Sequence, residues 1–169
     1  VVAFSVAASE DSLLAKELLE QAMGVHGIPD VVHADRGTSM TSKPVAQLLV
    51  DLGVTRSHSR PRVSNDNPYS ESAFKTLKYA PAFPDTFGSL ADARAFADRF
   101  FGYYNHEHRH CGIGLHTPAS VHYGTAGQVR NQRQHTLDAA YAARPERFGH
   151  RRPTPPKRPD QVRTHQPSR

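Results

Sequence analysis

Residues 31–37 of the chain read VVHADRG, a short apolar run that leads directly into an aspartate, Asp35, and a glycine, Gly37. Turn-forming residues bound the run on both sides, which is typical of a buried strand. Asp35 therefore falls at the carboxyl end of the predicted strand, where ligands gather in open α/β sheets. The stretch therefore predicts one strand of a sheet and, at the carboxyl end of that strand, a candidate functional site.

The residues before this strand predict another strand and a helix. Residues 1–6 are apolar and β-branched with partial alternation, which indicates a strand. Ser9 is expected to cap a helix with Glu10 and Asp11 in its first turn, where acidic side chains are favourable. The helix is expected to end within residues 24–29, which contain two glycines and a proline.

A helix, a strand and a further helix are expected after residue 37. Residues 42–53 predict a helix with a proline near its start and a glycine at its end, and residues 54–59 predict a strand. Residues 60–70 are rich in proline and asparagine and predict a loop, and residues 71–78 predict the next helix. Strands separated by helices of about ten residues favour an α/β layer with parallel pairing.

The second half of the chain is expected to be helical and then disordered. Ser89 can cap a helix whose aromatic and small side chains, from residue 93 to residue 104, form one core-facing stripe. Residues 126–143 predict a polar helix, and residues 144–169, which hold 6 of the 13 prolines, predict a mostly disordered tail. The chain is therefore expected to divide into a core region at residues 1–125, a helical extension at residues 126–143 and a tail at residues 144–169.

Composition excludes two classes of protein. The 169 residues contain no apolar run near the roughly 18–20 residues that span a bilayer, which excludes an integral membrane protein. The single cysteine, Cys111, cannot form an internal disulfide, so a disulfide-stapled domain is excluded and a reducing, cytoplasmic setting is expected.

Positive charge is concentrated in the tail. The chain carries a formal net charge of +5, and residues 144–169 hold 8 Lys or Arg against 2 Asp or Glu. The 143 residues before them have a net charge of −1. Two interpretations of the tail stay open: it contacts the phosphates of a nucleic acid, or it is a solubilising or unselected extension.

Asp35 and Glu71 are the candidate metal-ligating pair. Glu71 lies near the start of a predicted helix, after a loop that could fold over the same sheet edge as Asp35. Two carboxylates brought together repel each other unless a cation lies between them, and Mg²⁺ or Mn²⁺ suits oxygen ligands beside phosphates. The alternative is that Asp35 only forms a turn and that its pairing with Glu71 is a coincidence.

Lys75 and Lys78 follow Glu71 at four and seven residues, on the same helical face. Such lysines can hold nucleic-acid phosphates while the carboxylates hold the metal. The alternative is an ordinary salt bridge between the glutamate and a lysine of this face.

A set of short motifs occurs in order along the chain. They are HADRG at 33–37, TS at 41–42, NDNPYSE at 65–71, FKTLK at 74–78, YN at 104–105, HRH at 108–110 and TP at 117–118. Together they resemble the integrase core of bacterial insertion-sequence transposases, which is related to retroviral integrases. That family carries an Asp-Asp-Glu triad with 35 residues between its last two members, and 35 residues separate Asp35 from Glu71. The resemblance covers residues 1–123.

The resemblance implies an RNase H-like α/β fold, with a mixed sheet flanked by helices. It also implies DNA strand cleavage and transfer with two bound Mg²⁺ or Mn²⁺ ions, for which Asp35 and Glu71 would be catalytic and metal-binding residues. The residues implied to contact DNA are Arg36, Asn65, Lys75, Lys78 and Arg109. The implied partners are insertion-sequence ends and target DNA, on which a homo-oligomer assembles in a bacterial cytoplasm.

The chain departs from the family pattern at its start. The family's first catalytic Asp lies on the first strand of its sheet, upstream of the strand that residues 1–6 resemble, and neither Asp11 nor Asp30 replaces it. A start without Met, within a strand-like pattern, indicates a fragment that lacks the first strand and one of three metal ligands. We therefore expect weak catalysis from this chain alone. A catalytically inactive remnant that binds DNA or an intact transposase is the alternative function, and a free-standing RNase H-type nuclease is a third.

Overall fold

The computed structural model describes residues 1–60, 68–149 and 151–156 of the chain. Two units, residues 1–100 and 101–169, make up the chain, and the boundary between them lies inside a continuous helix. In this described part of the chain, no helix is both long and apolar enough to cross a membrane.

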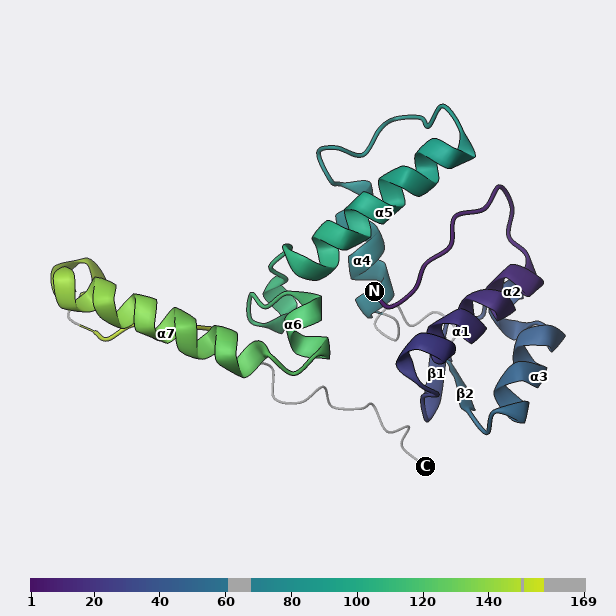
Figure 1. The fold of residues 1–169 in the computed structure, drawn as a ribbon, viewed down its shortest axis with the longest axis horizontal. Helices are drawn as coiled ribbons and strands as arrows, with labels where there is room; N and C mark the ends of the chain where they lie inside the picture. The colour runs from purple at the N-terminus through teal and green to yellow at the C-terminus, as the bar shows by residue number, and fades with distance from the viewer. Residues whose placement is uncertain (61–67, 150, 157–169) are drawn as a thin grey trace. The chain divides into compact units, whose positions relative to one another are not determined.

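A pair of parallel strands lies in the first unit (Figure 1). β1 (Val31–Ala34) pairs with β2 (Thr55–His58), first residue opposite first and last opposite last. The predicted parallel pairing is therefore confirmed. Exposed and half-buried side chains alternate along β1, and half-buried Val32 packs against the core of the unit.

Three helices pack together beside this strand pair (Figure 1). They are α1 (Ser12–His26), α2 (Thr38–Thr41) and α3 (Lys43–Asp51). Met23 of α1 packs against Val45 and Leu49 of α3, and Val54, just before β2, completes this buried core. The burial of these apolar side chains stabilises the arrangement of helices and strands.

Residues 1–7 do not form the strand that their sequence predicts. A strand needs a neighbour for its backbone hydrogen bonds, and within the described ranges the sheet contains β1 and β2 alone. The segment is held instead by a side chain from elsewhere in the first unit, since Arg94 Nε donates to the Val6 carbonyl at 3.0 Å.

The cap of α1 also differs from the prediction. Asp11 Oδ1 accepts a hydrogen bond from the Leu13 amide at 2.6 Å, so Asp11 is the cap and Ser9 is not. Gly27 follows the last turn with a φ of 87°, a value that glycine adopts without strain.

α4 (Pro68–Lys78) comes next among the described elements. It begins three residues before the predicted start at residue 71, because proline is favoured in the first turn of a helix. Glu71 lies in the first turn, while Lys75 and Lys78 lie in the last turn.

α5 (Leu90–His106) starts directly after Ser89, as predicted. Ser89 Oγ accepts a hydrogen bond from the Asp92 amide at 3.1 Å, which satisfies one of the first-turn donors. The aromatic stripe along this helix includes buried Phe100 and Tyr104, which confirms that it belongs to the core.

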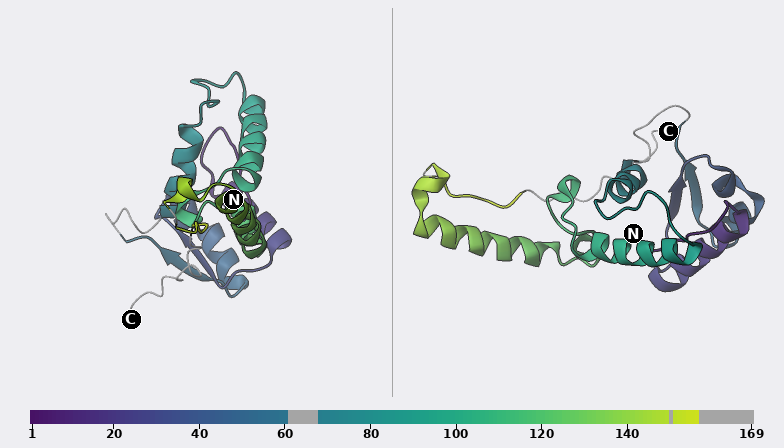
Figure 2. Two further views of the ribbon diagram at one scale, coloured as in Figure 1. Left: turned by 90° about the vertical axis from the view of Figure 1, so that its left-hand side faces the viewer. Right: turned by 90° about the horizontal axis from the view of Figure 1, so that it is seen from above.

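The second unit is built from short and long helices. After the end of α5 they are η2 (Cys111–Ile113), α6 (Pro118–His122), α7 (Ala126–Ala143) and η3 (Pro145–Phe148), of which η2 and η3 are 3₁₀ helices. α7 has the bounds that the sequence predicts. After η3 the chain reverses and runs back along α7 (Figure 2).

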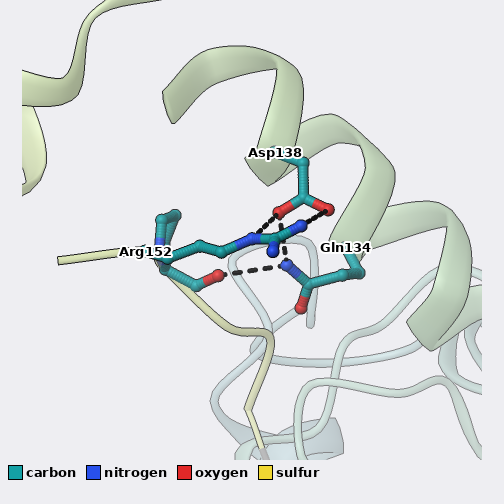
Figure 3. Close-up of polar contacts among 4 residues, drawn as sticks. Gln134, Asp138 and Arg152 are labelled. Atoms are coloured by element: carbon teal, nitrogen blue, oxygen red, sulfur yellow. Dashed lines mark hydrogen bonds and ion pairs between the residues drawn. The ribbon is translucent and has the colours of Figure 1, made fainter. Parts of the chain in front are cut away.

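The returning segment is held to α7 by polar contacts (Figure 3). Arg152 donates from Nε and Nη2 to the two carboxylate oxygens of Asp138, each at 2.9 Å. Gln134 Nε2 donates to Asp138 Oδ1 at 2.8 Å and to the Pro153 carbonyl at 3.1 Å. Part of the basic segment expected to be mostly disordered is therefore fixed by an acidic and an amide side chain of α7.

Candidate active site

The carboxylate of Asp35 lies at the carboxyl end of β1, where the sequence predicts it. Its Oδ1 accepts a hydrogen bond from the Gly37 amide at 3.0 Å, and the side chain is exposed. A Cβ on residue 37 would lie 3.1 Å from Asp35 Oδ1, so glycine permits this close approach. Within the described residues no hydrogen bond reaches Oδ2 of Asp35, and this oxygen can accept a ligand.

Residues at the end of β2 hold the backbone around Asp35. His58 Nδ1 lies 3.0 Å from the Asp35 carbonyl, so this nitrogen carries a proton and donates it. Arg36 Nε donates to the Ser59 carbonyl at 3.4 Å, and the Ser59 amide donates to the Ala34 carbonyl at 3.0 Å. His58 was not predicted as a site residue, although the predicted parallel pairing of the strands, which places it opposite Ala34, is a signal for it.

A second carboxylate, Glu10, contacts the turn that follows Asp35. Glu10 Oε1 accepts from Ser39 Oγ at 2.7 Å, from Thr38 Oγ1 at 3.1 Å and from the Ser39 amide at 3.2 Å. These hydrogen bonds, the one from the Ser39 hydroxyl foremost, lower the pKa of the Glu10 carboxyl. The prediction that Glu10 lies in the first turn of α1 is wrong, because the helix starts two residues later and the side chain reaches a distant turn instead.

Glu71, Lys75 and Lys78 are all exposed on α4. In the part of the chain that the structure describes, neither lysine forms an ion pair with Glu71, so the salt-bridge alternative is not realised. The charged groups of this helix are therefore accessible to partners from solution. Asn65 lies outside the described residues.

The described residues do not assemble a complete metal site. None of their His, Cys, Asp and Glu side chains form a group of three or more that could hold an ion. Asp35 and Glu71 supply carboxylate oxygens, which Mg²⁺ and Mn²⁺ prefer. The chemistry of each donor fits a divalent ion, and within the described ranges neither belongs to a group of three ligand-type side chains.

Arg109 belongs to the second unit, between α5 and η2. It lies near Arg133 of α7: burial lowers the pKa of the Arg133 guanidinium, and the charge of Arg109 lowers it further. Arg133 itself donates to the Gly114 carbonyl at 3.3 Å and to the Leu115 carbonyl at 2.5 Å. The two arginines concentrate positive charge in this unit, which suits a phosphate partner.

Two family models match the chain in succession. Both are described as an integrase core domain, and they match residues 1–64 and 52–118. The matched stretches together contain Asp35, Glu71 and Arg109.

Two relatives are similar to part of the chain. The transposase for insertion sequence element IS904 of Lactococcus lactis is 30% identical over 121 residues, which is 70% of this chain and 48% of that protein. An uncharacterized protein of Caenorhabditis elegans is 29% identical over 108 residues, which is 64% of this chain and 8% of that protein. The chain thus spans about half the length of the first relative and a small part of the second.

A solved structure has a similar fold. The catalytic core domain of BIV integrase matches 73% of this chain and 78% of its own, with a TM-score of 0.53 and 22% identity. This likeness confirms the predicted RNase H-like fold class, of which the parallel pair of β1 and β2 is the part of the sheet found among the described residues. Because the two matches to this kind of domain together cover residues 1–118, the chain belongs to the integrase core domain family.

Proposed function

We propose that this chain is the catalytic part of a transposase or integrase, a polynucleotidyl transferase that cuts DNA strands and joins them to new ends. The observation that carries the proposal is the pair Asp35 and Glu71, which lie at the end of β1 and in the first turn of α4 within the matched domain. The proposed substrates are the ends of an insertion sequence and a target DNA, in a bacterial cytoplasm.

Asp35 and Glu71 are proposed to hold Mg²⁺ or Mn²⁺, two ions in the complete site. Such ions, when bound, lower the pKa of a water or a DNA 3′-hydroxyl and stabilise the leaving oxygen. Asp35 Oδ1 is engaged by the Gly37 amide, so Oδ2 is the atom of this side chain that is offered to an ion. The hydrogen bond also fixes the direction of the carboxylate, which reduces the entropy lost on binding.

Four basic residues and one asparagine are proposed to contact DNA. They are Arg36, Asn65, Lys75, Lys78 and Arg109. The exposed lysines of α4 support this part of the proposal, because neither is neutralised by Glu71 in the described part of the chain. Phosphate contacts of this kind give affinity that falls steeply with salt. A homo-oligomer assembled on DNA is part of the same proposal.

The alternative function is a catalytically inactive chain that binds DNA or an intact transposase. The observation that favours it is the lack, among the described residues, of any group of three ligand-type side chains. A two-metal site with too few carboxylates binds its ions weakly. We therefore propose that this chain by itself transfers phosphoryl groups slowly.

DNA binding is tested by the fluorescence anisotropy of a labelled duplex at several salt concentrations. Lys75→Ala/Lys78→Ala is compared with Lys16→Ala/Lys43→Ala, which removes the same charge from two other helices. The slope of log K against log salt is expected to become shallower by about 1.8 for the first variant, since each duplex phosphate contact contributes about 0.9, and to stay unchanged for the second. Equal slopes for the two variants would contradict the assignment of the α4 lysines.

Catalysis is tested by plasmid nicking in Mn²⁺. Slow nicking that Asp35→Asn and Glu71→Gln abolish, and that the matched variant Asp30→Asn leaves intact, supports the proposed catalytic pair. Salt-dependent DNA binding without any nicking supports the inactive alternative. Nicking that persists in both Asp35→Asn and Glu71→Gln refutes the assignment of the site.

A further inference from the structure

Glu10 is exposed, yet a single oxygen of its side chain accepts three hydrogen bonds. All three come from Thr38 and Ser39, which lie 28 and 29 residues further along the chain. Two of the donors are hydroxyl groups and one is the backbone amide of Ser39, so the contact fixes both side chains and the course of the backbone. A carboxylate is well suited to this role because charged acceptors form the stronger hydrogen bonds.

The turn that Glu10 holds is the one that orients Asp35. Gly37 donates its amide to Asp35 Oδ1 and immediately precedes Thr38. A Cβ placed on Gly37 would lie 3.1 Å from Asp35 Oδ1 and 4.0 Å from Glu10 Oε1, so the two carboxylates flank the same glycine. Any movement of residues 38 and 39 therefore moves the donor that fixes the Asp35 carboxylate.

On its other side, Asp35 is held by the strand pair. His58 donates to the Asp35 carbonyl, and Ser59 pairs with Ala34 across the end of the sheet. These contacts fix the backbone of Asp35. The rotation of its side chain is restrained by the hydrogen bond from the Gly37 amide. The direction of the carboxylate thus depends on the turn, and the turn depends on Glu10.

We propose that Glu10 is a positioning residue, whose three hydrogen bonds fix the turn at residues 37–39 and thereby direct the Asp35 carboxylate toward its ligand. Its ligand is taken to be a divalent metal ion, and in that respect the inference rests on the proposed function. Glu10 acts through the turn and does not itself bind the ion. A glutamine can accept the same hydrogen bonds without the negative charge, which separates positioning from electrostatic attraction.

The test uses the full chain and three variants. Glu10→Ala removes the acceptor, and Glu10→Gln keeps an acceptor and removes the charge. Glu20→Ala is the matched control, because Glu20 forms an exposed ion pair with Lys16 within α1. Hydrogen exchange of the Ser39 and Gly37 amides is followed by NMR. The Val54 amide, bonded to the Leu49 carbonyl, reports the stability of the whole unit.

Exchange of the Ser39 and Gly37 amides is expected to become about tenfold faster in Glu10→Ala, a factor typical of one lost hydrogen bond, with no change at Val54. In Glu20→Ala the exchange is expected to stay within about twofold of the wild type. In Glu10→Gln it is expected to rise by less than in Glu10→Ala, because the amide oxygen still accepts hydrogen bonds, although weaker ones. Unchanged exchange in Glu10→Ala overturns the inference. Exchange that is as fast in Glu10→Gln as in Glu10→Ala also overturns the inference, because the effect would then come from the lost charge.

Line broadening of the Gly37 amide by Mn²⁺ then tests the link to a metal. We expect Glu10→Ala to need about tenfold more Mn²⁺ than the wild type for the same broadening, and Glu10→Gln to need less Mn²⁺ than Glu10→Ala. Broadening that is equal in Glu10→Ala and the wild type overturns the positioning role. If Mn²⁺ broadens no signal in the wild type while the exchange results hold, the turn depends on Glu10 as inferred, and it is the proposed metal function of Asp35 that fails.

Discussion

Leu49→Ala tests how strongly the small core of the first unit determines its stability. Leu49 is 1% exposed and packs with Met23, Val45 and Val54. The substitution deletes about three methylene equivalents, which corresponds to about 2.4 kcal/mol of transfer free energy at about 0.8 kcal/mol each. The cavity left between α3 and α1 adds to this, so the free energy of unfolding is expected to fall by about 3 kcal/mol.

The matched control is Val50→Ala in the same helix. Val50 is 72% exposed, and its truncation is expected to change the free energy of unfolding by less than about 0.5 kcal/mol. Urea unfolding is followed through the NMR signals of residues 43–58, which cover α3 and β2. With a urea dependence of about 1–3 kcal/mol per molar for a small unit, Leu49→Ala is expected to lower the midpoint by about 1–3 M.

Loss of the dispersed signals of residues 43–58 in Leu49→Ala without urea also meets this expectation. A midpoint that moves no further for Leu49→Ala than for Val50→Ala would refute the reasoning. It would mean that α3 is not attached to α1 and the strand pair through the side chain of Leu49.

Gly27→Ala is expected to destabilise the first unit by about 1–2 kcal/mol because residue 27 has a φ of 87°, whereas Gly24→Ala, within α1 and with open space around it, is expected to stabilise it by about 0.5–1 kcal/mol. Thermal unfolding measures the change in stability of each variant. A change in the same direction for both variants would contradict the argument from the backbone conformation. The contact between Asp138 and Arg152 is expected to depend on pH, because hydrogen bonds from Arg152 and Gln134 lower the pKa of the Asp138 carboxyl. Since the pKa is lowered in the folded chain, the contact contributes fully to the stability of the folded chain above the ordinary pKa of an aspartate. This contribution is lost as the pH falls through the lowered value. The ¹⁵Nε shift of Arg152 follows this titration, and Asp138→Asn should abolish it.

Local patterns predicted the elements whose bounds depend on near neighbours in the chain. The start of α5 follows from the hydroxyl of Ser89, which reaches an amide three residues away. The strand expected at residues 1–6 is not formed, because its hydrogen bonds depend on a partner strand that a local pattern does not specify. Ser9 and Asp11 are both good capping residues, and the choice between them depends on where the helix begins.

The candidate site shows the same difference between contacts within a short stretch of chain and contacts between distant residues. The position of Asp35 was predictable, because the apolar run of β1 ends there and a turn follows. The contact from Glu10 was not, since it joins residues at least 28 positions apart, whereas the predicted parallel pairing was a signal for the contact from His58, 23 positions from Asp35. They exist because β2 lies parallel to β1 and because the chain from Glu10 through α1 and β1 returns to Thr38 and Ser39.

The contact between Glu10 and Ser39 determines where the chain tolerates a change of length. Glu10 precedes α1 and Ser39 follows β1, so the chain between them, which contains both elements, must return to its starting point. One residue inserted within α1 rotates the preceding segment by about 100° and shifts it by about 1.5 Å, which separates Glu10 from Ser39. An insertion between Gly27 and Asp30 changes only the reversal between helix and strand. Homologous chains are therefore expected to vary in length at this reversal and to keep the 15 residues of α1.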